Sequence, residues 1–246
     1  MTTAPFGSWS SPITADLIVS KSVSIGEVFV GGNDVWWSEA RPEEGGRVQL
    51  VRHHPGGGAV DVLPEGFGAR TRVHEYGGGA WWLHGSDVVF VNWADQRLYR
   101  LAAGTSTPTA LTPEPAERHG DRYADGRFTA DGRWVVCVRE RHVSADVEPV
   151  NEIVAVRVHN HGEPAEPVVL VSGSDFVAAP RVNPAGNVLT WFRWNHPDMP
   201  WDGTELCVAS MYDDQLDNGQ IVVGDTRIVA GGRDESITQP EWAPDG

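Results

Sequence analysis

The sequence predicts an all-β fold: a β-propeller of about four four-stranded blades plus the first strand of a fifth, so that the ring is incomplete. Three observations lead to this prediction. Turn-forming residues are abundant, with 28 Gly and 17 Pro among 246 residues. Short runs rich in β-branched and aromatic residues lie between them, a pattern typical of many short antiparallel strands. An eight-residue pattern also recurs roughly every 50 residues, which is the size of a propeller blade.

The repeated octet has an apolar residue at its fourth position and glycine at its eighth. A second apolar run follows each of the first four glycines, and a repeated strand–turn–strand unit buries its apolar face only by stacking on its neighbours. A β-sandwich explains the strands but not the spacing, and a parallel β-helix has shorter repeats. The octets read IGEVFVGG, GGAWWLHG, DGRFTADG, APRVNPAG and QPEWAPDG, and their apolar anchors are Val28, Trp81, Phe128, Val182 and Trp242.

We expect a single partial domain over residues 1–246. The blades are expected at residues 16–64, 73–113, 121–173 and 176–231, and the next blade at 236–246. The sequence ends on Pro-Asp-Gly, a turn that ordinarily leads into another strand. Alternatively, the segment from Ser236 to Trp242 pairs inside the first sheet and closes a small ring. In an open ring, the exposed flank and edge strands favour self-association of the chain.

Charge and cysteine content narrow the possible partners and location. The chain has 19 Lys and Arg against 34 Asp and Glu, a formal net charge of −15. Nucleic acid and anionic membranes are therefore not expected as partners, whereas a cationic group such as a peptide N-terminus is compatible. No signal peptide and no apolar run of about 20 residues is recognisable. Cys137 and Cys207 lie in apolar runs; we expect free buried thiols and a cytoplasmic protein, with a single disulfide as the alternative.

The stretch RVHEYGGG is the sharpest local feature of the sequence. It leads into the anchor Trp81, so we expect it on or just before the innermost strand of the second blade. A glutamate there could pair with a substrate ammonium, while the histidine or tyrosine could hydrogen-bond a peptide. The alternative is that Glu75 pairs with Arg70 or Arg72 and that the motif only sets blade packing. The candidate substrate-binding residues are Arg72, His74, Glu75 and Tyr76.

No cofactor and no metal ion are expected. The nine histidines do not follow a ligand spacing such as H-E-x-x-H, and PGGGAVD lacks the G-K-[ST] of a phosphate loop. The charged stretch ERHGDRYAD, residues 117–125, occupies the equivalent entrance to the third blade. Its charges could line the channel, although a solvated loop held by weak ion pairs is the simpler interpretation.

Several stretches together resemble the N-terminal propeller of a known peptidase family. They are SPITADLIV, RVHEYGGGAWW, RYADGRFTADGRWVVCVRE, RWNHPDMPWDGTEL and QPEWAPDG. The family is that of bacterial prolyl oligopeptidase-type serine peptidases, in the acylaminoacyl-peptidase-like and dipeptidyl-aminopeptidase-like branch. The resemblance covers essentially the whole chain. It implies a propeller, usually seven-bladed, that gates and orients peptide or small amide substrates for an α/β-hydrolase domain with a Ser, Asp and His triad.

That hydrolase domain is missing from these residues. No stretch fits the G-x-S-x-G nucleophile elbow, so no catalytic residue is expected here. The alternative function is that of a stand-alone propeller acting as a protein-interaction or ligand-binding module.

The stretch RWNHPDMPWDGTEL is expected to form a long loop between the second and third strands of the fourth blade. The resemblance implies a place beside the hydrolase domain, because rim loops often contact partner domains. Packing of its two tryptophans against the blade is the alternative. The candidate residues for the domain interface or rim loop are Arg193, Trp194, His196, Asp198, Trp201 and Asp202.

Overall fold

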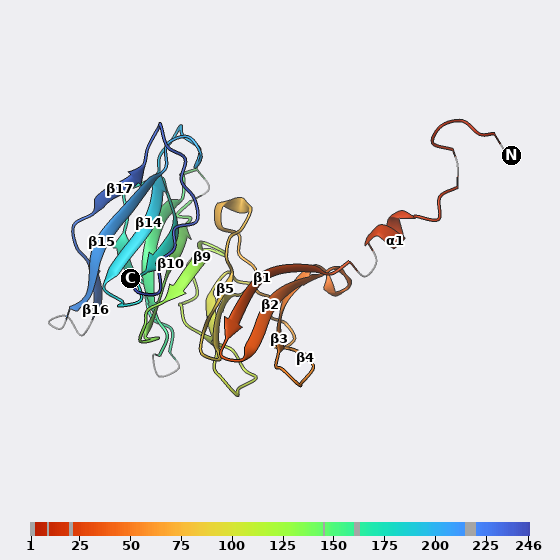
Figure 1. Ribbon diagram of the computed structural model, residues 1–246, viewed down its shortest axis with the longest axis horizontal. Helices are drawn as coiled ribbons and strands as arrows, with labels where there is room; N and C mark the ends of the chain where they lie inside the picture. Colours follow the sequence, from red (N-terminus) through yellow and green to blue (C-terminus); the bar gives the residue numbers. More distant parts are fainter. Residues whose placement is uncertain (1–2, 9, 20–21, 145, 160–162, 215–219) are drawn as a thin grey trace.

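The computed structural model describes residues 3–8, 10–19, 22–144, 146–159, 163–214 and 220–246 (Figure 1). Over these residues the fold is all-β apart from one short helix, α1 (Ala15–Val19), and two 3-10 turns, η1 (Pro42–Glu44) and η2 (Val73–Glu75). None of these described helices has the length and apolar character that a membrane crossing requires. Four antiparallel sheets follow one another along the chain, which confirms the predicted propeller class.

The first three sheets each contain four strands in sequence order, as expected for propeller blades. Their strands are β1 (Ser24–Gly31), β2 (Asp34–Arg41), β3 (Arg47–His53) and β4 (Ala59–Asp61) in the first sheet; β5 (Trp81–His84), β6 (Asp87–Val91), β7 (Leu98–Leu101) and β8 (Thr109–Ala110) in the second; and β9 (Asp121–Phe128), β10 (Trp134–Arg141), β11 (Val150–Arg157) and β12 (Val168–Val171) in the third.

The fourth sheet departs from this plan at its outer edge. Two short strands share the outermost position, because β16 pairs with the end of β15 and β17 with its beginning. The strands are β13 (Phe176–Val182), β14 (Val188–Trp194), β15 (Glu205–Asp214), β16 (Gln220–Val223) and β17 (Arg227–Gly231).

The apolar core is divided into three clusters, one between each pair of successive sheets. Successive residues on a strand point to opposite faces, so Trp81 packs towards the first sheet and Trp82 towards the third. In the same way, Val136 and Val138 of β10 contribute to one cluster, and Val135 and Cys137 to another. A middle sheet buried on both faces therefore needs a continuous apolar run, which explains WVVCV in β10 and DVVFV in β6. Both cysteines, Cys137 and Cys207, are free and buried in these clusters, as predicted.

The first strands of successive sheets contact one another and form the inner edge of the arc. Strand β1 contacts β5, β5 contacts β9, and β9 contacts β13. In Figure 1 the first and fourth sheets lie at opposite ends of this arc. The outer face of the first sheet is consequently uncovered, and Val28, Val30 and Val35 are exposed there, Val30 to 75%.

The final segment, residues 236–246, contains no strand in the described structure, so the expected strand conformation at the start of a fifth blade is wrong. A strand requires a partner ladder, and Pro240 and Pro244 have no N–H to donate to one. The segment instead lies along the inner edge, where Trp242 Nε1 donates to the carbonyl of Arg181 at 3.1 Å. The first sheet consists of β1 to β4, so the alternative in which this segment pairs within it is wrong as well.

Candidate functional site

The candidate site begins with a tight turn formed by RVHEYG, residues 72–77, which we call the His74 turn. It lies just before β5, where the sequence placed it. His74 and Glu75 both adopt left-handed backbone conformations, with φ of 55° and 65°. Non-glycine residues rarely adopt this conformation. The surrounding structure must therefore supply contacts that hold the turn.

Glu140, at the end of β10, supplies several of these contacts. It is only 2% exposed. The backbone N–H of His74 donates to its Oε2 at 2.7 Å, and His142 Nε2 lies 2.6 Å from its Oε1. Burial acts to raise the pKa of this carboxyl, but the hydrogen bonds from His74 and His142 outweigh it and lower the pKa to about 2. Glu140 is therefore a buried anion whose charge is stabilised by surrounding donors.

Arg122, on β9, connects Glu140 to the exposed part of the turn. Its Nη1 donates to Glu140 Oε1 at 3.1 Å, to the carbonyl of Arg72 at 3.1 Å and to Glu75 Oε1 at 2.6 Å. The partner of Glu75 is thus an arginine of the next blade, so the alternative in which Glu75 pairs with Arg70 or Arg72 is wrong. Those two guanidinium groups lie over the ring of Trp93, at 4.4 and 3.9 Å from its centroid.

Glu75, Glu140 and His142 form the one group in the described residues that could offer three ligand atoms to a metal ion, all within 4.8 Å of one another. The guanidinium of Arg122 already contacts both carboxylates of this group. Because arginine stays protonated in proteins, a metal ion held between Glu75 and Glu140 would have to share both carboxylates with this guanidinium. The arrangement is therefore better described as a network of side-chain ion pairs than as a metal site.

A side chain is disfavoured at each of the three glycines that follow Tyr76, because of the backbone conformation at the first and of close contacts at the other two. Gly77 has φ of +94°, which disfavours a side chain. A Cβ on Gly78 would lie 3.1 Å from the Cβ of Ala124 in β9. A Cβ on Gly79 would lie 3.0 Å from Asp125 Oδ1 and 3.1 Å from Glu27 Oε1. The glycine run thus lets β9 approach the segment closely.

An aromatic cluster joins the His74 turn to the fourth sheet. The His74 ring lies 5.7 Å from Phe176 and 6.5 Å from Trp194, and Phe176 stacks on Trp194 at 5.1 Å. The His196 ring is 5.0 Å from Phe176. Tyr76 lies beside His74 and is 80% exposed. The structure therefore brings together residues from the two stretches that the sequence selected separately.

Of the remaining rim-loop candidates, Arg193 lies on β14, while Asp198, Trp201 and Asp202 lie between β14 and β15. Arg193 pairs with Glu205 at 2.8 Å, and Asp198 pairs with Arg233 at 2.8 Å. Asp202 accepts a hydrogen bond from the backbone N–H of Met199. Trp201 is different, because it is 64% exposed and presents a large apolar surface to solvent.

A second group of charges, missed by the sequence analysis, lies on the inner edge. Burial, and next the negative charge of Asp125, raise the pKa of Glu27 to about 7. Nearby, Glu241 lies 2.7 Å from Arg181 and 3.4 Å from Arg127. A signal was present, because Glu27, Arg127, Arg181 and Glu241 all occupy the third position of the repeated octet.

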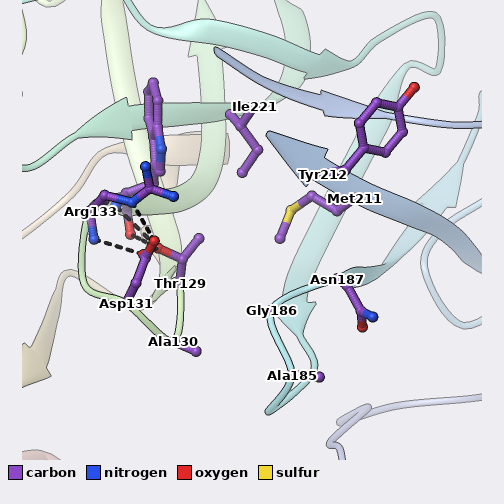
Figure 2. A pocket seen from close by; sticks show the side chains of 11 residues that line it. Thr129, Ala130, Asp131, Arg133, Ala185, Gly186, Asn187, Met211, Tyr212 and Ile221 are labelled. Atoms are coloured by element: carbon purple, nitrogen blue, oxygen red, sulfur yellow. Dashed lines mark hydrogen bonds and ion pairs between the residues drawn. The ribbon is translucent and has the colours of Figure 1, made fainter. Parts of the chain in front are cut away.

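A separate pocket of about 310 Å³ lies between the third and fourth sheets, at the ends of β9 and β10 away from Arg122 and Glu140. Figure 2 shows Asp131 and Arg133 on one side of it and Met211 and Tyr212 on the other. Asp131 and Arg133 form an ion pair with each other. The pocket contains none of the predicted site residues, and we regard the His74 turn as the stronger candidate site.

The similarity of the chain to known proteins comes from solved structures. No family model and no curated protein sequence matches it. Among solved structures, a puromycin-hydrolysing peptidase of Mycobacterium tuberculosis is 42% identical over 98% of the chain, with a TM-score of 0.85. Puromycin hydrolase is 36% identical over the whole chain, with a TM-score of 0.86, and a mutant of it complexed with PGG is 37% identical over 99%, with a TM-score of 0.85.

The fold and these similarities define a peptidase-type β-propeller. The chain belongs to the prolyl oligopeptidase family, as the sequence resemblance predicted, and corresponds to the propeller portion of its members. It spans only 37–38% of the length of the matched peptidases.

Proposed function

We propose that this propeller portion gates and orients peptide or amide substrates for a serine hydrolase domain in the complete protein. The similarity to puromycin-hydrolysing peptidases over nearly the entire chain supports this role. The chemistry belongs to the hydrolase domain, and the propeller contributes exclusion and orientation. The residues that bind substrate are those of the His74 turn.

The observation that carries this proposal is the state of Glu75. Its side chain is 74% exposed, yet its Oε1 is bonded to Arg122. A carboxylate with one oxygen held by a guanidinium and the other facing solvent is a pre-oriented acceptor for a substrate ammonium group. Pre-orientation lowers the entropic cost of binding. The exposed ring of Tyr76 next to it offers a second, cation–π contact for the same ammonium.

The complete protein tests this assignment with two substrates, an amino-acid amide with a free amine and its N-acetylated counterpart. Glu75→Gln removes the charge and keeps the shape, so we expect kcat/KM for the free-amine substrate to fall about tenfold, or 1.4 kcal/mol. The N-acetylated substrate should change less than about twofold.

Glu43→Gln is the matched control, because Glu43 is an exposed carboxylate of the η1 turn without a role in this proposal. Equal effects of Glu75→Gln on both substrates would contradict the amine-binding role. A complete protein without amidase or peptidase activity would instead favour the stand-alone binding module.

We also propose that the isolated chain self-associates through the uncovered face of its first sheet. Val28, Val30 and Val35 lie on that face, opposite to the face that packs on the second sheet. Val30→Lys should shift the chain towards monomer in light scattering coupled to size exclusion. Val143→Lys, at an exposed valine of a loop, should leave the distribution unchanged. A monodisperse wild-type monomer would contradict this proposal.

A further inference from the structure

Glu140 stands out among the buried charges of the described residues because its contacts cross from one blade to another. Its strand belongs to the third sheet, whereas the His74 N–H that it accepts precedes the second sheet, 66 residues earlier in the sequence. Its two carboxylate oxygens contact different partners. Oε2 faces the backbone N–H and ring Nδ1 of His74, and Oε1 faces Arg122 and His142.

We propose that Glu140 is a positioning residue that holds the His74 turn in its left-handed conformation and thereby sets the orientation of Glu75 and Tyr76. The inference rests on the proposed function for its consequence in substrate binding. Its structural part stands on the contacts alone.

The backbone explains why a carboxylate is needed at this place. Three local hydrogen bonds exist within the turn: from Glu75 N to Arg72 O and from Gly77 N to Val73 O, both at 2.9 Å, and from Tyr76 N to Val73 O. The His74 N–H has no acceptor of this kind, and in the left-handed conformation it points at Glu140. Without Glu140 a partly buried N–H donor would lose its acceptor, which disfavours the turn.

The side chain of Arg122 transmits the same control to Glu75. A single nitrogen, Nη1, contacts Glu140, Glu75 and the carbonyl of Arg72. The Arg122 side chain is 13% exposed, so it is enclosed by its partners. The negative charge of Glu140 fixes this guanidinium, and the guanidinium in turn fixes Glu75 Oε1.

No single amide can replace these contacts. In Glu140→Gln, one of the two oxygens becomes an NH₂ group, which cannot accept a hydrogen bond. The NH₂ group then faces either the backbone N–H of His74 or the guanidinium of Arg122, and in both cases a donor lies against another donor. The variant keeps the volume of the side chain, so the sheet itself should still form.

Glu152 provides a matched control in the same sheet. It is also buried, lies on the neighbouring strand β11, and bonds to Arg139 with an Nη2–Oε2 distance of 2.5 Å. It pairs with Arg139 and Arg141, which both lie outside the His74 turn. Glu152→Gln therefore weakens a buried ion pair of the same kind without touching the turn.

The first measurement is hydrogen exchange of the His74 and Gly77 backbone amides. We expect Glu140→Gln to speed exchange at both amides about tenfold relative to wild type, while Glu152→Gln leaves them within about twofold. Equal protection of these amides in the two variants would overturn the positioning role.

The second measurement is kinetic and uses the complete protein with the free-amine amide. A positioning role predicts that Glu140→Gln raises KM about tenfold with kcat within about twofold, because binding is lost while the chemistry is untouched. Glu152→Gln should leave both constants unchanged. Faster exchange at His74 with an unchanged KM would keep the structural part and overturn amine binding at Glu75. A fall in kcat without a change in KM would overturn the positioning of substrate.

Discussion

Glu140 and Glu27 are both carboxyl groups withdrawn from solvent, and they lie in neighbouring parts of the same propeller. The pKa of Glu140 is lowered to about 2, whereas that of Glu27 is raised to about 7. Burial acts in the same direction on both. The difference comes from their surroundings. Glu140 faces His74, Arg122 and His142, whereas for Glu27 the effect of burial and the Asp125 carboxylate outweighs a hydrogen bond from the Ala80 backbone and the charge of Arg127.

The groups around a buried carboxylate therefore determine whether its ionised form stabilises or destabilises the folded protein. The Glu140 region is an ion network that fixes a turn. The Glu27 region is a carboxyl pair gathered at the inner edge beside Gly79, which lacks the side chain that would separate the two groups.

Removing the Glu140 side chain should have the largest effect. Glu140→Ala leaves the guanidinium of Arg122 and the N–H of His74 without their acceptor, so we expect a loss of about 3–5 kcal/mol of unfolding free energy. Urea unfolding followed by circular dichroism measures it. Glu43→Ala, at an exposed glutamate, should stay within about 0.5 kcal/mol of wild type. A Glu140→Ala loss below about 1 kcal/mol would show that the network is not an anchor.

Acid should remove the contribution of Glu140 in a defined window. Its pKa in the folded state lies below the ordinary value of 4.5, so its stabilisation is present above pH 4.5 and is lost as the pH falls towards 2. The loss amounts to about 3 kcal/mol at most. In Glu140→Gln this part of the pH dependence should disappear. An unchanged acid slope in that variant would assign the slope to other carboxyl groups.

Glu27 should give the opposite pH dependence. Its pKa in the folded state lies above 4.5, so the folded protein binds more protons than the unfolded chain between pH 4.5 and 7, and stability falls as the pH rises through this window. Glu27→Gln should flatten this fall and stabilise the chain at pH 7.5 by about 2 kcal/mol. Thermal unfolding at several pH values measures the difference. A destabilised Glu27→Gln variant at pH 7.5 would mean that the hydrogen bond from the Ala80 backbone and the charge of Arg127 outweigh burial and the repulsion from Asp125.

Gly79→Ala should have the smallest effect. Its Cβ would come within about 3 Å of an oxygen of Asp125 and of Glu27, so a modest shift of both side chains is required and about 1 kcal/mol should be lost. Gly58→Ala is the control, since no heavy atom lies within 4 Å of the corresponding Cβ. Identical stabilities of the two variants would show that the carboxyl pair is not confined by the glycine.

The sequence predicted the features that depend on local pattern. Repeated octets located the sheets, because strand alternation and turn chemistry are encoded within a few residues. The same octets carried the charged third position of Glu27, Arg127, Arg181 and Glu241, a regularity that could have been recognised. The residues 236–246 matched the octet but did not form a strand, because a strand also depends on a partner.

Glu140 could not have been selected in this way. Its contacts with His74 and Arg122 depend on how two blades stack, and the separation of 66 residues between Glu140 and His74 hides that relation. The available hint was a buried strand, WVVCVRER, that ends in charged residues. The expected partners of Glu75 were local arginines, whereas the stacking of blades provided Arg122.

The most direct test of this account is a titration of the glutamate side-chain carboxyl groups by carbon-13 NMR, with Glu27 and Glu140 assigned through their Gln variants. The account predicts that Glu140 stays ionised down to a pH of about 2 and that Glu27 titrates near pH 7. If both carboxyl groups titrated near 4.5, or if their order were reversed, the contrast between Glu140, stabilised as an anion, and Glu27, opposed by burial and Asp125, would be contradicted.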